Sequence, residues 1–139
     1  MKLGKICPKQ YKPPPKFQDL EVSRDALKIQ KRLGAGCFGE VFLALYFNKL
    51  EVAVKQLKPG SMPVEEFLEE AITMHKLSHK HIVQILGVVT RSEPILVITE
   101  FMRQGSLLDI LHTKRDLTPS HLLNFLIDVC RMAISGGFF

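Results

Sequence analysis

The chain has 139 residues, a length that allows one domain with a sizeable core but not two. With 46% apolar and 24% charged residues, its composition is that of a soluble globular protein and excludes the disordered, collagen-like and membrane classes. The net charge of +5 suits an anionic partner such as phosphate, nucleic acid or a membrane surface, although five lysines lie in the first sixteen residues, where a solvated tail explains them at least as well.

The cysteines and the absence of long apolar runs bear on the compartment. Cys7, Cys37 and Cys130 have neither the even number of a disulfide framework nor metal-ligand spacing, which predicts free thiols in a reducing compartment. The sequence has no apolar h-region of a signal peptide and no run approaching the ~20 apolar residues of a spanning helix. We therefore expect a cytoplasmic protein without a transmembrane segment.

In the first half of the chain we expect a linker followed by a meander of β-strands. Residues 1 to about 19 are expected to be a linker, because KPPPK favours polyproline II and the segment has no hydrophobic period. From Leu27 onward, LKIQKRL, EVFLALYF and LEVAVKQL read as strands, with turn candidates at 34–39 and at Asn48-Lys49. Three strands on short connections predict an antiparallel meander.

Pro59-Gly60 ends the third expected strand. A helix and two further strands are expected after it. The segment from about Val64 to Leu77 follows a helical period. Two more strands are expected around HIVQILGVV and PILVITEF, with residues 90–93 as the turn between them.

Two helices are expected at the end of the chain. Ser106 begins S-L-L-D, a capping-box pattern that opens a short helix. Thr118-Pro119 supplies an N-cap and a proline at the first helical position, which predicts a longer helix from Ser120 to about Met132. The last seven residues, AISGGFF, fit no element.

Residues 34–41 read GAGCFGEV, with three glycines in the spacing G-x-G-x-x-G. A Rossmann dinucleotide site needs a helix directly after the glycines, but the strand EVFLALYF is expected there. A Walker loop ends in G-K-[ST], whereas this one ends in G-E-V. The remaining interpretations are a glycine-rich hairpin whose backbone lies close over phosphates, and a tight hairpin without a ligand.

A lysine on an apolar strand provides an independent signal. Strand alternation places Lys55 on an apolar face, where an ammonium group is costly unless it is paired. At ~100° per residue, Glu70 falls on the core side of the predicted helix, whereas Glu65 and Glu69 point away and Glu66 lies at the margin. The sequence therefore predicts a Lys55–Glu70 pair; the alternative is that Glu70 is a half-exposed surface carboxylate.

Four motifs occur in order along the chain. They are L-G-A-G-C-F-G-E-V at 33–41, V-A-V-K at 52–55, E-E-F-L-E-E-A at 65–71 and I-T-E-F-M-R-Q-G-S-L-L-D at 98–109. Together they resemble the N-terminal lobe of a protein kinase, most closely that of the Src-type cytoplasmic tyrosine kinases. The resemblance runs from about Val22 to Cys130.

The resemblance implies an α+β fold. A five-stranded antiparallel sheet with one helix between strands 3 and 4 would be followed by a hinge and by the first two helices of a truncated C-lobe. The implied division is a proline-containing linker at 1–21, an N-lobe with an ATP-binding glycine-rich loop at 22–102, the hinge end and the start of the C-lobe at 103–131, and a divergent tail at 132–139.

The resemblance also implies ATP as the cofactor, with Mg²⁺ in the family. Lys55 would hold the α- and β-phosphates and pair with Glu70, and the amides of the loop 34–39 would cover the phosphates. Thr99 matches the small gatekeeper residue, and Asp109 would lie near the ribose. The residues that the resemblance assigns to ATP are Leu33, Gly34, Ala35, Gly36, Cys37, Phe38, Gly39, Glu40, Val41, Ala53, Lys55, Glu70, Thr99, Glu100, Met102 and Asp109.

Within that set, Leu33, Val41 and Ala53 would sandwich adenine, and the backbones of Glu100 and Met102 would bond to it from the hinge. Outside the set, the resemblance places Met74 and Ile85 in a hydrophobic stack that joins the two lobes of a kinase.

Two departures from the family accompany the resemblance. Phosphoryl transfer uses H-R-D-x-x-x-x-N and D-F-G, and neither motif occurs in the 139 residues. We therefore expect no catalytic residue, no metal ligand and no phosphotransfer by this polypeptide. Leu20 stands where Src-type kinases usually carry a Trp that couples the linker to the helix with Glu70.

Two function classes stay open. The first is the ATP-binding portion of a kinase whose family transfers phosphate to protein tyrosine, with phosphotyrosine- and proline-binding regulatory domains outside this chain. The second is a non-catalytic fragment that binds nucleotide weakly or competes for partners of the full-length kinase. Neither class implies binding to nucleic acid.

Overall fold

The computed structural model describes the backbone of residues 15–77 and 79–135, and the side chains of residues 18–77 and 79–131. Five strands form one antiparallel sheet in the order β1-β2-β3-β5-β4, and a helix lies between the third and fourth strands in sequence, as expected. The elements are η1 (Pro15–Leu20) and η2 (Arg24–Ala26), which are 3-10 helices, β1 (Leu27–Ala35), β2 (Gly39–Tyr46), β3 (Leu50–Leu57), α1 (Val64–Lys76), β4 (Ile85–Val89), β5 (Leu96–Glu100), α2 (Leu107–Thr113) and α3 (Pro119–Ser135).

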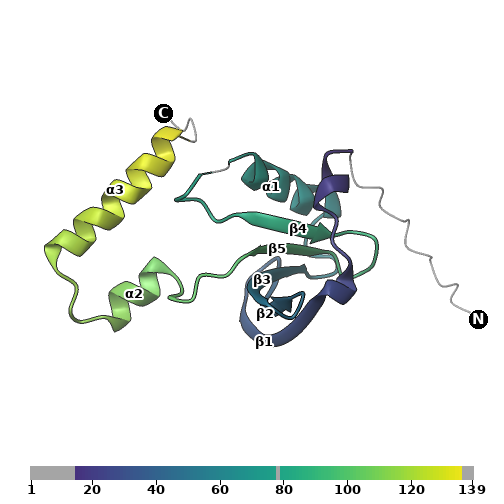
Figure 1. Ribbon diagram of the computed structural model, residues 1–139, viewed down its shortest axis with the longest axis horizontal. Helices are drawn as coiled ribbons and strands as arrows, with labels where there is room; N and C mark the ends of the chain where they lie inside the picture. The colour runs from purple at the N-terminus through teal and green to yellow at the C-terminus, as the bar shows by residue number, and fades with distance from the viewer. Residues whose placement is uncertain (1–14, 78, 136–139) are drawn as a thin grey trace, which may run out of the picture.

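Strand β3 lies in the middle of the sheet and supplies two hydrophobic cores. Its side chains alternate between the two faces, so that Leu57 joins the core under α1, whereas Val52 and Val54 join the core on the opposite face. Figure 1 shows α1 lying along β4 and covering one face of the sheet. The core under α1 consists of Leu57, Phe67, Leu68, Ala71, Ile85, Val88, Ile95 and Val97, and the opposite core of Ala44, Val52, Val54, Val89, Leu96 and Ile98.

The segment between η1 and η2 lies along the outer edge of β4. The N–H of Val22 donates to the carbonyl of Val88 at 2.8 Å, and Glu21 forms a parallel bridge with Val88. Gly87 permits this close approach, because a Cβ there would lie 2.4 Å from Cγ2 of Val22. Leu20 packs against the core under α1. Part of the expected linker is therefore a strap across the sheet edge.

The carboxylate of Glu21 holds this strap to the end of β4. Its Oε1 accepts the N–H of Thr90 at 2.9 Å and that of Arg91 at 3.3 Å, and its Oε2 accepts the Thr90 hydroxyl at 2.7 Å. Arg24 donates to the hydroxyl and the carbonyl of Ser92, both at 3.0 Å. Because Thr90 is buried, its two bonds to Glu21 satisfy donors that water does not reach.

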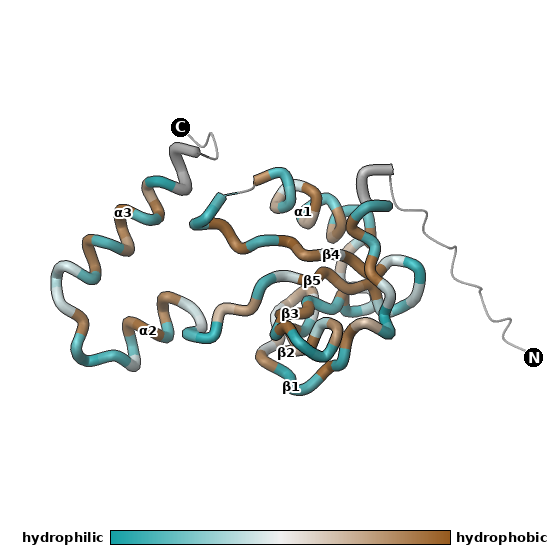
Figure 2. The backbone as a smooth tube through the Cα atoms, viewed as in Figure 1, coloured by the Kyte–Doolittle hydropathy of each residue, from teal (hydrophilic) through white to brown (hydrophobic). Residues whose placement is uncertain are grey.

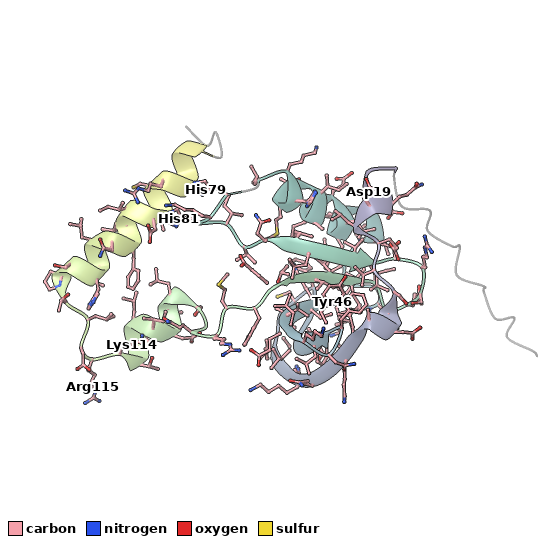
Figure 3. The ribbon with its side chains drawn as sticks, in the orientation of Figure 1. Asp19, Tyr46, His79, His81, Lys114 and Arg115 are labelled. Atoms are coloured by element: carbon pink, nitrogen blue, oxygen red, sulfur yellow. The ribbon has the colours of Figure 1, made fainter. Side chains whose placement is uncertain are left out.

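Helices α2 and α3 lie away from the sheet (Figure 1). Brown, hydrophobic residues recur along α3 in Figure 2. His81, in the connection between α1 and β4, places Nε2 3.5 Å from Oδ1 of Asp128 on α3, and Figure 3 shows His79 and His81 beside this helix. Apolar side chains that stay exposed on the two helices are Leu107, Leu108, Leu111, Leu122, Leu123, Leu126, Ile127 and Val129.

Several strand boundaries differ from those expected. Strand β1 continues to Ala35 and β2 begins at Gly39, so the glycine turn is shorter than 34–39. Strand β4 begins at Ile85 and not at residue 81, because the preceding residues form a turn in which the N–H of Ile82 donates to the carbonyl of His79 at 3.0 Å.

The turn between β2 and β3 is centred on Phe47 and Asn48, one residue earlier than expected. Both have positive φ, 48° and 55°, and the N–H of Lys49 donates to the carbonyl of Tyr46 at 3.1 Å. Asn tolerates this left-handed backbone, whereas Phe rarely adopts it. Turns of this kind match the twist of the strands they join, and that tertiary requirement prevailed over the local preference of Phe47.

Helix α3 is longer than expected. The expectation that AISGGFF forms no element is wrong for residues 133–135, which continue the helix, while residues 136–139 lie outside the described part. No helix breaker precedes the glycines at 136 and 137, so the helix continues past Met132. At the other end, the N–H of His121 lies 3.0 Å from the carbonyl and 3.4 Å from the hydroxyl of Thr118, which confirms the expected cap.

The expectation of polyproline II in KPPPK is wrong at Pro15 and Lys16, which begin η1. The fixed φ of proline suits the first turn of a helix as well as an extended segment. Residues 12–14 lie outside the described part. None of the helices within the described residues combines the length and apolar character that crossing a membrane requires.

We predict that Glu21→Ala lowers the free energy of unfolding by about 1–3 kcal/mol, because the buried Thr90 would lose an acceptor for two donors. Glu66→Ala, at an exposed position on α1, should change it by less than about 0.5 kcal/mol. Urea denaturation followed by circular dichroism measures both, since the chain has no Trp. Equal midpoints for the two variants would contradict the role of Glu21.

Candidate functional site

Lys55 on β3 and Glu70 on α1 form an ion pair. Nζ lies 3.3 Å from Oε1 and 3.2 Å from Oε2, so the pairing expected from the two periodicities is present. The ring of Phe67, one turn earlier on α1, has its centre 5.4 Å from Nζ, a cation–π distance. The side chains of Lys55 and Glu70 are 35% and 52% exposed, so the pair adds only about 0–1 kcal/mol to stability. Its effect is to fix the position of the ammonium group.

A cavity of about 230 Å³ adjoins this pair between α1, β3, β4 and β5. Its volume is below the ~300–1,000 Å³ of pockets that bury a drug-sized ligand, so it accommodates part of such a ligand. Three polar residues line it, namely Lys55, Glu70 and Thr99. The rest of the wall is apolar and consists of Val41, Ala53, Phe67, Ala71, Met74, Val83, Ile85 and Val97.

The three glycines of the β1–β2 hairpin differ in whether the fold requires a glycine at their position. Gly39 is required by packing, since a Cβ there would lie 2.1 Å from the carbonyl oxygen of Gln56. A Cβ on Gly34 or Gly36 would meet no atom of the chain within 4 Å, and neither has a positive φ. The fold therefore does not need glycine at 34 and 36. Glycine is also used where a bound molecule lies close to the main chain, because a side chain would block its approach. Gly34 and Gly36, which neither packing nor backbone conformation requires, fit such a loop.

Comparison with known families identifies the class of protein. A family model described as protein tyrosine and serine/threonine kinase matches residues 27–134. The chain belongs to the protein kinase family. The match begins at β1 and contains all five strands, α1 and α2, and it ends within α3. It starts and ends later than the stretch 22–130 on which the sequence resemblance depends.

The structure brings some of the expected site residues together and leaves others apart. Val41, Ala53, Lys55, Glu70 and Thr99 line the one cavity described above. The remaining expected residues do not line it; they are Leu33, Gly34, Ala35, Gly36, Cys37, Phe38, Gly39, Glu40, Glu100, Met102 and Asp109. The structure thus brings together the Lys55–Glu70 pair, Thr99 and two of the five expected adenine contacts, Val41 and Ala53.

Glu100 and Met102, expected as the hinge, form hydrogen bonds within the chain. The N–H of Glu100 donates to the carbonyl of Gln84 at 3.1 Å, and the Glu100 carboxylate accepts the N–H of Gln84 at 2.9 Å. The carbonyl of Met102 accepts the N–H of Gly105 at 3.1 Å. In this conformation the hinge is braced by the protein itself.

Asp109, expected near a ribose, is the third helical residue of the capping box of α2, whose N-cap is Ser106. Its carboxylate accepts the N–H of Ser106 at 3.2 Å and the Ser106 hydroxyl at 2.6 Å, while the N–H of Asp109 donates to the Ser106 hydroxyl at 3.1 Å. This is the capping box predicted from S-L-L-D. The hydrogen bonds from Ser106 hold the pKa of the Asp109 carboxyl below its ordinary value.

Met74 and Ile85, which the resemblance places in a hydrophobic stack, also line the cavity, together with four residues that were given no site role. Phe67 and Ala71 lie on the core-facing side of α1 together with Glu70, so the helical period contained the signal that they belong to the site. Val97 lies beside Lys55 in the β3–β5 register, and strand registers are not readable from sequence. Val83 precedes β4 in an irregular segment, and no pattern indicated it.

Metal ligands are a separate question for this kinase chain. In the residues that the structure describes, no group of three or more His, Cys, Asp or Glu side chains could hold a metal ion. Kinases hold Mg²⁺ with an Asn and an Asp of the H-R-D and D-F-G motifs, which are absent from the 139 residues. The described residues therefore do not fit this ion.

We predict that Gly36→Ala and Gly39→Ala differ in stability. Gly39→Ala should lower the free energy of unfolding by about 1–3 kcal/mol, because the new methyl group overlaps the backbone of Gln56. Gly36→Ala should leave it unchanged or raise it by up to about 1 kcal/mol, because the methyl group meets open space. Urea denaturation measures both, and equal losses would show that the fold requires both glycines.

Proposed function

We propose that residues 22–131 are the ATP-binding portion of a non-receptor protein tyrosine kinase of the Src type. The observation that carries the proposal is the Lys55–Glu70 pair at the wall of a mostly apolar cavity, next to a loop with two glycines that the fold does not need. Kinases use these features together to bind ATP.

The proposed roles follow from the position of each group. The Lys55 ammonium binds α- and β-phosphate oxygens, and Glu70 orients it for that contact. Val41 and Ala53 contact adenine from the sheet side, with Leu33 joining them from β1. Thr99, partly buried at the cavity wall, leaves room beyond the adenine because its side chain is small.

The loop and the hinge complete the proposed site. The N–H groups of residues 34–39 lie over the phosphates, where Gly34 and Gly36 allow close approach. The backbones of Glu100 and Met102 bind the adenine edge, and Asp109 lies toward the ribose. The Met102 carbonyl accepts the N–H of Gly105 with one lone pair and keeps its second lone pair for adenine.

The tyrosine and Src-type assignment rests on the sequence motifs. The matching family description includes both tyrosine and serine/threonine kinases. The four motifs at 33–41, 52–55, 65–71 and 98–109 together resemble Src-type tyrosine kinases most closely. This resemblance supports protein tyrosine as the acceptor in the family reaction, ATP + protein tyrosine to ADP + protein phosphotyrosine. Regulatory phosphotyrosine- and proline-binding domains would be partners outside these 139 residues.

A second candidate is a non-catalytic role for the chain. The observation in its favour is that the 139 residues contain neither H-R-D-x-x-x-x-N nor D-F-G. A polypeptide with Lys55 and Glu70 but without those motifs would bind nucleotide or compete for the partners of a complete kinase. ATP binding is common to both candidates, and phosphotransfer separates them.

We predict that the chain binds ATP and that Lys55→Met weakens the binding by roughly 10- to 100-fold, because a charge-assisted contact to phosphate is lost. Lys76→Met, at the exposed end of α1, serves as the control and should keep the wild-type Kd. Titration of fluorescent ATP with each variant measures the difference. The same Kd for wild type and Lys55→Met would refute the proposed phosphate contact.

We also predict that the 139-residue chain does not transfer phosphate to a tyrosine peptide, because it lacks the base and the metal-binding residues of kinases. The measurement is incorporation of radiolabel from ATP, with Lys55→Met assayed in parallel. Label that disappears in the variant would overturn the prediction. Label that persists in the variant would come from a contaminating kinase.

A further inference from the structure

The tip of the glycine-rich loop is bonded to the turn that follows β3. The carbonyl of Phe38 accepts the N–H of Lys58 at 3.1 Å and lies 2.9 Å from the Ser61 hydroxyl. The side chains of Cys37 and Phe38 are exposed, the latter by 54%, so they add little to holding the tip. The backbone carbonyl of Phe38 is therefore an anchoring point of the loop.

A tight turn presents the Ser61 hydroxyl to this carbonyl. In Lys58-Pro59-Gly60-Ser61, the N–H of Ser61 donates to the carbonyl of Lys58 at 3.1 Å, and Gly60 has φ of 75°. Proline followed by a glycine with positive φ is the signature of a type II turn, in which the N–H of the fourth residue donates to the carbonyl of the first. Ser61 is thus held in position independently of the loop.

The hydroxyl has one proton and two neighbouring acceptors. Besides the Phe38 carbonyl, the Lys58 carbonyl lies 2.7 Å from Oγ of Ser61. A serine hydroxyl donates one hydrogen bond at a time. The Lys58 carbonyl already accepts the N–H of Ser61, so its turn stays closed when the hydroxyl donates to Phe38. A bond to the Lys58 carbonyl stays within the turn, whereas a bond to the Phe38 carbonyl joins the turn to the loop.

We propose that Ser61 is a positioning residue that holds the tip of the glycine-rich loop against the connection between β3 and α1. This connection joins the strand with Lys55 to the helix with Glu70. One hydroxyl thereby fixes the loop to the connection between the two elements that carry the ion pair. The importance of this contact for nucleotide binding rests on the proposed function, whereas the contact itself does not.

Amide hydrogen exchange of the full chain, measured by NMR without nucleotide, tests the proposal. The reporting amides are Lys58 N–H, bonded to Phe38, and Gly36 N–H, which closes the hairpin on the Gly39 carbonyl at 2.8 Å. The reference is Val22 N–H, bonded to Val88 on the far edge of the sheet. In Ser61→Ala, the exchange of both reporters relative to the reference should rise roughly two- to tenfold, the factor equivalent to one ordinary hydrogen bond.

Two controls separate a loop effect from a general one. Ser61→Thr keeps the hydroxyl and should keep the wild-type ratio. Ser23→Ala removes a hydroxyl that caps nothing in η2, and it should also leave the ratio unchanged. An unchanged ratio in Ser61→Ala would overturn the proposal. Equal acceleration of Val22, or loss of the folded spectrum, would also overturn it, because Ser61 would then stabilise the whole fold.

Because the measurement uses no ATP, its result is independent of the proposed function. Failure of the chain to bind ATP would contradict the proposed function. The exchange ratios would still show whether Ser61 holds the loop.

Discussion

The alternation of side chains along β3 is the constraint on which the rest of the structure depends. Val52 and Val54 are fully buried on one face, while Ala53 and Lys55 point to the cavity side. A shift of one residue in the pairing with β2 or β5 would exchange these faces and place the ammonium group in a sealed core. The two cores thus fix the strand register, and the register fixes the direction of the lysine.

The position of α1 follows from the same core. Phe67, Leu68 and Ala71 are buried against the sheet, and this packing sets the rotation of the helix about its axis. Glu70 then projects from the margin of the buried stripe toward Lys55. A pair that itself stabilises the fold only slightly is placed by apolar contacts that stabilise it strongly. The ion pair is a result of core packing and not its cause.

Local periodicity explains what the sequence could predict. The faces of β3 and α1 depend on periods of 2 and 3.6 residues, so the Lys55–Glu70 pair could be expected from the order of the residues alone. The capping box at Ser106 was likewise readable, because it spans four residues. Contacts between distant residues could not be read in this way. Glu21 and Thr90 are bonded across 69 positions, and neither has a sequence pattern that indicates the other.

The role of Ser61 was hidden for a different reason. Pro59-Gly60 predicted the end of the third strand, but the partner of the hydroxyl is a backbone carbonyl, and every residue carries one. The expected adenine and hinge contacts also depend on information beyond local pattern. Leu33 is 41% exposed on β1, and its distance from the cavity depends on how strongly the β1–β2 hairpin twists over the sheet.

The strap formed by residues 20–22 has a consequence for association between molecules. An unpaired edge strand offers a row of backbone donors and acceptors to any other extended chain, which is a common route to aggregation. The sheet has two edges, β1 and β4. The strap occupies part of the β4 edge through Val22 and Val88, while β1 carries Lys28, Lys31 and Arg32, whose charges repel a second copy of the same strand. Removing the strap would therefore expose a hydrophobic edge strand to pairing with other molecules. The chain would become more prone to fibril-like stacking as well as less stable.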